Sequence, residues 1–175
     1  FWTQRFNWSN EKQQYVMLGV TGPNEYENNV NNNWYTNYIA RWCIQFSLEV
    51  EERFQLDNVL LHAGEKEAME KVAANVYFPH LENTNIFLQQ DGFTDKELLN
   101  ATDLPDSERP INQHWSWDRI LRSVFIKQAD VLQGVYLFED HFSEEVIKDN
   151  FYYYEPKTVH ESSLSPCVHS ILAAK

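Results

Sequence analysis

The chain has 175 residues, of which 43% are hydrophobic and 15% aromatic, and its formal net charge is −12. The hydrophobic content predicts a folded domain with a sizeable core and excludes a disordered chain. The acidic balance argues against nucleic acid and against anionic membranes as partners, because both carry the same sign of charge.

The first predicted elements are helices. Apolar residues at steps of three and four predict a helix over 32–54, and good helix formers predict a second over 65–76. Residues 84–93 lack helical spacing, so we expect an extended segment that ends in a turn at Gly92. A short helix is expected over 95–100.

The second half of the chain opens with a polar loop over 101–110, which carries two prolines. A last helix is expected from Ser165, with Ser165 as the N-cap and Pro166 as the first helical residue. Neither an internal repeat nor a convincing pair of strands is found. The pattern therefore predicts an all-α protein that forms one domain over 1–175, with three further helices between the loop and the last helix, over 117–124, 128–138 and 143–151.

The chain opens with Phe1 rather than Met, and no run approaches the roughly 18 apolar residues that cross a bilayer. Cys43 and Cys167 have no metal-binding or redox spacing. We therefore expect an internal piece of a longer protein in a reducing, cytoplasmic compartment, with no membrane partner.

The segment 19–33 is the most unusual in the chain. It has a turn at Gly22 and Pro23, and six of the ten residues from Asn24 to Asn33 are Asn. Glu25 lies among these amides, which could hold its carboxyl group in one orientation, as a general acid requires. The alternative is a polar loop whose Asn side chains cap the following helix.

Lys127 and Gln128 form a second candidate, since an ammonium group and an amide suit sugar hydroxyls. Two solvated polar residues at a helix start are the alternative.

The third candidate is the segment of His160, Ser162 and Ser163, just ahead of the last helix. The free N–H groups of a helix N-terminus attract anions, so a phosphate group could lie there, although Ser also serves as a plain N-cap. The remaining histidines, His169 among them, form no ligand pattern, and no metal site is expected.

Four segments, in order along almost the whole chain, are similar to the inverting disaccharide phosphorylases of glycoside hydrolase family 65. They are residues 19–37, 86–93, 127–132 and 152–174. The resemblance implies an (α/α)6 barrel in a much longer polypeptide, of which this chain supplies about the second half. It also implies cleavage of an α-glucosyl disaccharide by inorganic phosphate, with inversion. The Asn-rich sequence within residues 19–33 is most similar to that of maltose-specific members.

In this resemblance Glu25 matches the proton donor of the family's Gly-Pro-Asp/Asn-Glu-Tyr motif. Phosphate replaces the activated water of inverting hydrolases and would raise the pKa of Glu25. The residues after Glu25 depart from the commonest family pattern, which affects the loop beside the acceptor sugar. The other residues implied are Lys127 and Gln128 for the sugar, and His160, Ser162 and Ser163 for phosphate.

Other functions remain open. They are an inverting α-glucoside hydrolase on the same barrel, a phosphorylase for trehalose, kojibiose or nigerose, a non-catalytic sugar-binding module that uses the aromatic side chains, and a helical interaction domain. The expected partners are the disaccharide, phosphate, the remainder of the polypeptide and a second copy in a homodimer. No cofactor is expected beyond phosphate as a co-substrate.

Overall fold

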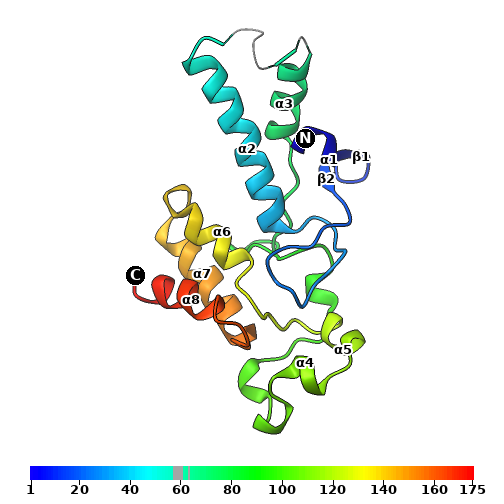
Figure 1. Ribbon diagram of the computed structural model, residues 1–175, viewed down its shortest axis with the longest axis vertical. Coiled ribbons are helices and arrows are strands. Elements are labelled where there is room, and N and C mark those ends of the chain that lie inside the picture. The colour runs from blue at the N-terminus through cyan, green and yellow to red at the C-terminus, as the bar shows by residue number, and fades with distance from the viewer. Residues whose placement is uncertain (57–60, 63) are drawn as a thin grey trace.

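The computed structural model describes residues 1–56, 61, 62 and 64–175. The described part is rich in helix and has one small sheet (Figure 1). Its helices are α1 (Trp2–Arg5), α2 (Trp34–Arg53), α3 (Glu65–Ala74), α4 (Ile111–His114), α5 (Trp117–Leu121), α6 (Val131–Leu137), α7 (Glu144–Tyr154) and α8 (Ser165–Ala173).

The longest helix, α2, packs against α3 at one end of the elongated molecule (Figure 1). Its start is fixed by Asn33, whose side-chain oxygen accepts a hydrogen bond from the Thr36 N–H at 2.9 Å and so satisfies a free donor of the first turn. Both helices lie close to the predicted ranges. The segment that carries Glu25 leads directly into this capped start.

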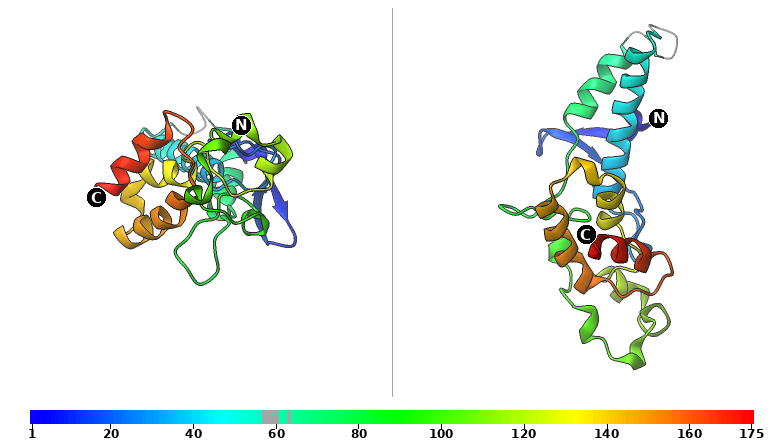
Figure 2. Two further views of the ribbon diagram at one scale, coloured as in Figure 1. Left: turned by 90° about the horizontal axis from the view of Figure 1, so that it is seen from below. Right: turned by 90° about the vertical axis from the view of Figure 1, so that its left-hand side faces the viewer.

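A two-stranded sheet corrects the all-α prediction. Strands β1 (Phe6–Ser9) and β2 (Gln14–Met17) pair in antiparallel register, with Phe6 opposite Met17. The hairpin projects to one side of the α2–α3 pair (Figure 2). Phe6 and Met17 are buried against residues of α2 and α3, so the strands form because the two helices cover one face of the hairpin.

The largest core lies between the start of α2 and the group α6–α8, which pack together (Figure 1). Trp34 is 1% exposed and stacks on Phe87 and Tyr38, with ring centroids 4.6 and 4.9 Å apart. Gly134 of α6 allows this approach, because a Cβ atom there would lie 2.7 Å from the Trp34 ring. This core anchors α2 and α6, whose starts both lie beside the candidate site.

The predicted helix over 95–100 is wrong. A single 3-10 turn covers Phe93–Asp95, and then the Glu97 N–H donates to the Arg122 carbonyl at 2.8 Å while its own carbonyl accepts from the Val124 N–H. Backbone pairing with a distant segment has overridden the local preference. By contrast, the turn at Gly92 is confirmed, with φ of +71°.

The loop over 101–110 contains two 3-10 turns and no α-helix. The last helix starts one residue earlier than expected. Leu164 is the N-cap and Ser165 is the first helical residue, since the Ser165 hydroxyl bonds to His160 instead of capping the helix. The structure contains no helix, within its described residues, that is long and apolar enough to cross a membrane.

Candidate active site

Glu25 lies on a loop that is anchored on both sides. Its neighbours Asn24 and Tyr26 are each 1% exposed, whereas 61% of the Glu25 side chain is exposed. The turn before it requires glycine, because a Cβ atom at Gly22 would lie 2.4 Å from the Asn33 amide nitrogen. Buried neighbours therefore hold the backbone while the carboxyl group points outward.

The structure brings three of the predicted residues into direct contact. The Glu25 N–H donates to the Gln128 side-chain oxygen at 3.0 Å, and the Lys127 ammonium donates to Glu25 Oε2 at 2.5 Å. The Lys127 N–H donates to Asn24 Oδ1 at 3.0 Å. Two segments about 100 residues apart in sequence thus form one unit around the Glu25 carboxyl group.

The electrostatics of Glu25 differ from the expectation. Hydrogen bonds from Lys127 and Gln128, together with the charge of Lys127, lower the pKa of Glu25. The expected rise depended on a phosphate anion beside the carboxyl group. Within the chain itself the nearest charge is the Lys127 ammonium, which stabilises the ionised form.

The segment of His160, Ser162 and Ser163 lies beside this unit. Ile126 pairs with Thr158 in parallel, and the Val159 N–H donates to the Ile126 carbonyl at 2.9 Å, so Lys127 and His160 follow neighbouring extended segments.

A side-chain bond also joins this segment to the Glu25 loop. The Tyr26 hydroxyl donates to Glu161 Oε2 at 2.6 Å, and the same carboxylate accepts from the Ile111 N–H. The bond to the Glu25 loop therefore comes from Glu161, which the sequence did not single out.

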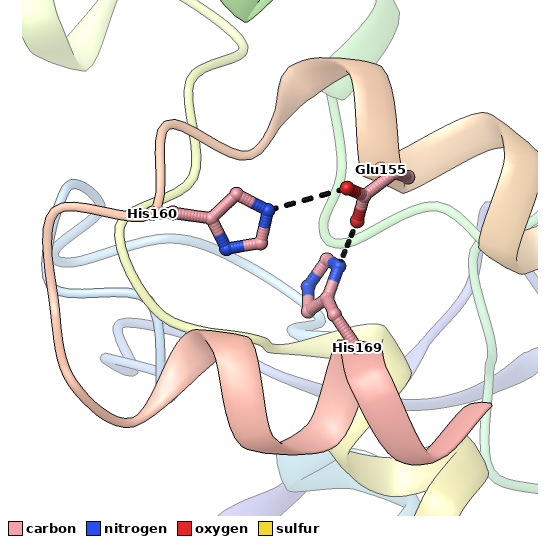
Figure 3. Close-up of side chains that lie close together, drawn as sticks. All are labelled: Glu155, His160 and His169. Carbon is pink, nitrogen blue, oxygen red and sulfur yellow. Dashed lines mark hydrogen bonds and ion pairs between the residues drawn. The ribbon is translucent and has the colours of Figure 1, made fainter. Parts of the chain in front are cut away.

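One cluster of potential metal ligands is found among the described residues (Figure 3). Glu155 bonds to the Nδ1 atom of His169 and lies 3.3 Å from the Nε2 atom of His160. Two imidazoles and a carboxylate could hold a zinc ion. In this geometry the carboxylate oxygens already accept from both rings, while the buried Nε2 atom of His169 has no hydrogen-bond partner among the described residues.

The charges in this cluster follow from those bonds. Burial alone would raise the pKa of Glu155, but the bonds and charges of His169 and His160 bring it below the usual value. Burial lowers the pKa of His169, which is 4% exposed. Glu155 is therefore ionised and lies between the two histidines. His169 has no ligand-like spacing in the sequence, because the cluster forms only when α8 folds back onto the end of α7.

All 175 residues match the family model "Glycosyl hydrolase family 65 central catalytic domain". The chain belongs to glycosyl hydrolase family 65.

Several relatives within family 65 are phosphorylases. The chain is 52% identical, over its whole length, to maltose phosphorylase of Bacillus subtilis, and 35% identical, over 98% of its length, to kojibiose phosphorylase of Halothermothrix orenii. A solved structure from the human microbiome, provisionally named kojibiose phosphorylase, superposes with a TM-score of 0.87 at 35% identity and covers 98% of the chain. The chain spans about a quarter of each relative, namely 24%, 23% and 24%.

The family 65 chain also contains a buried polar network that the sequence analysis missed. Asp130 is 2% exposed and accepts hydrogen bonds from the Asn33 amide at 3.0 and 3.1 Å and from the Asn24 N–H at 3.3 Å. Burial raises the pKa of Asp130 to about 7, against the effect of these bonds, and the charge of Glu27 raises it further. In the sequence Asp130 resembles an ordinary helix cap, but its side chain makes no capping bond.

Proposed function

We propose that the protein containing this chain is a disaccharide phosphorylase that cleaves maltose with inorganic phosphate and inversion. Its products are β-glucose 1-phosphate and glucose. The observation that carries the proposal is the contact of Glu25 with Lys127 and Gln128, on a loop tied to the His160 segment. Family membership and 52% identity to a maltose phosphorylase support it, and the lower identity to a kojibiose phosphorylase, 35%, favours maltose.

In the proposed reaction the Glu25 carboxyl group gives its proton to the glycosidic oxygen. A phosphate oxygen attacks C1 of the glucosyl group from the opposite face, so the C1–O bond to the leaving glucose breaks as the new C1–O bond forms. The configuration at C1 inverts. Phosphate is already an anion, so no second carboxylate is needed to activate the nucleophile.

Lys127 and Gln128 would bind sugar hydroxyls beside this acid. The Lys127 ammonium also stabilises the carboxylate that Glu25 becomes after proton transfer. When sugar hydroxyls or phosphate bind, they would compete with the Glu25 carboxylate for the hydrogens of the Lys127 ammonium group. Each bond to Glu25 that Lys127 gives up raises the pKa of Glu25, and this favours the protonated form that a general acid needs. Lys127 would thus link substrate binding to the charge of the acid.

The proposed phosphate cradle comprises His160, Ser162 and Ser163. Its support is its place at the start of α8 and its link to the Glu25 loop through the bond between Tyr26 and Glu161.

We further propose that the chain is a fragment of the catalytic barrel domain and supplies about the second half of an (α/α)6 barrel. The remainder of the polypeptide would cover the exposed apolar side chains of α2, where Trp42 and Phe46 stack at 37% and 49% exposure. Cys43 and Cys167 are both free, which supports a reducing, cytoplasmic location.

The test is incubation of the intact protein with maltose, with and without phosphate, and identification of the sugar phosphate and its anomer by NMR. The proposal predicts β-glucose 1-phosphate and glucose in equal amounts, and only when phosphate is present. Glucose release without phosphate would indicate the hydrolase instead. A parallel series with trehalose, kojibiose and nigerose tests the preference for maltose.

A further inference from the structure

Three elements meet at the carboxylate of Glu155, beside the proposed phosphate cradle. Glu155 caps the C-terminus of α7, His160 lies in the loop before α8, and His169 lies on α8 (Figure 3). The imidazole rings of His160 and His169 are 4.8 Å apart and nearly perpendicular. The cluster therefore fixes the loop from both of its flanking helices.

The ring of His160 is fully engaged within the chain. Its Nε2 atom faces Glu155 Oε1 at 3.3 Å, and its Nδ1 atom lies 2.6 Å from the Ser165 hydroxyl oxygen. A carboxylate can only accept, so Nε2 carries a hydrogen, and Nδ1 shares a second hydrogen bond with the Ser165 hydroxyl. Glu155 thereby holds the ring in the orientation that closes the loop between His160 and Ser165.

The backbone of this loop needs such support. His160 has φ of +54°, in the left-handed region that L residues seldom occupy. The adjacent Glu161 is held separately by the Tyr26 hydroxyl and the Ile111 N–H. Two consecutive residues of the loop are thus held by carboxylates. Glu155 holds His160 from the α7 side, and the carboxylate of Glu161 bonds to Tyr26 on the Glu25 side.

Both ring nitrogens of His160 are engaged within the chain, so His160 serves the proposed cradle by holding the loop, and the donors left to an anion are the Ser162 and Ser163 hydroxyls and the loop N–H groups. We propose that Glu155 is a positioning residue for phosphate: through His160 it holds the loop so that these donors converge on the anion. This inference rests on the proposed function. Glu155 would affect how tightly phosphate binds, without touching it, whereas Glu25 would transfer the proton.

The test uses the intact protein and compares Glu155→Gln with the matched control Glu145→Gln, an exposed glutamate on the same helix α7. KM is measured separately for phosphate and for maltose. Glu155→Gln should raise KM for phosphate about tenfold or more, the usual effect of removing a supporting residue, and change KM for maltose less than about twofold. Glu145→Gln should behave as the wild type.

Unchanged KM for phosphate in Glu155→Gln would overturn the inference, and so would an equal rise in both KM values, which indicates general disruption. Loss of wild-type activity with a chelator, restored by zinc, would show that the cluster binds a metal and would overturn it too. If Glu155→Gln does not fold, Glu155→Asp provides a second test. Its side chain keeps the charge but is too short to reach both histidines, so KM for phosphate should again rise while KM for maltose changes little. Wild-type protein that cleaves maltose without phosphate would refute the proposed function itself, independently of Glu155.

Discussion

The replacement of Asp130 by Asn should make the protein less sensitive to pH. The pKa of the buried Asp130 carboxyl group is about 7 in the folded chain, whereas the pKa of an exposed Asp has its ordinary value of 3.8. The folded state therefore binds one proton more than the unfolded state between these values. The contribution of Asp130 to stability is consequently fully present below about pH 4 and is lost as the pH rises to 7. Asn keeps the shape of the side chain but cannot ionise.

The magnitude follows from the size of the shift. A difference of about three pKa units corresponds to about 4 kcal/mol, at 1.36 kcal/mol per unit. Between pH 5 and pH 7 the wild type should lose about 2–3 kcal/mol relative to Asp130→Asn.

Chemical denaturation of the intact protein at both pH values measures this difference directly. Asp140→Asn, at an exposed position, is the matched control and should show no such change. If the difference between wild type and Asp130→Asn is the same at pH 5 and pH 7, Asp130 is not the buried acid described above.

Three other changes should have distinct effects. Tyr26→Phe removes the bond to Glu161 and should cost about 1.5–3 kcal/mol of stability, measured by denaturation, because a buried hydroxyl bonds to a charged acceptor; a cost below about 0.5 kcal/mol would contradict that bond. Gly22→Ala should cost about 1–3 kcal/mol, since its Cβ would overlap the buried amide and carboxylate behind the turn, and a neutral effect would show that the packing there is loose. Lys127→Met should raise the pKa of Glu25 in the free protein, followed by NMR titration, and an unchanged titration would exclude the ion pair.

The spacing of apolar residues predicted the long helices, because the residues that form one face of a helix lie close together in the sequence. The start of α2 was also predictable, since Asn33 is a common capping residue. The β-hairpin and the pairing of Glu97 were not, because both depend on distant segments that cover or bond them. A strand of four residues is also too short to show a clear alternation of apolar and polar residues.

The candidate site shows the same division. Glu25, Lys127 and Gln128 were singled out by residue type and by resemblance to a family, but nothing in their spacing predicts that the two segments touch. Glu155 was missed for a physical reason, since an isolated glutamate after a helix usually faces solvent. Only the return of α8 past the end of α7 places it between two histidines.

In the proposed reaction, everything depends on the transfer of a proton from Glu25 to the leaving sugar. The most direct measurement is phosphorolysis of maltose by the intact protein carrying Glu25→Gln, with Glu82→Gln, an exposed loop residue, as the control. We expect kcat to fall by roughly a hundredfold to ten-thousandfold in Glu25→Gln and to be unchanged in the control. Turnover of Glu25→Gln close to that of the wild type would contradict it.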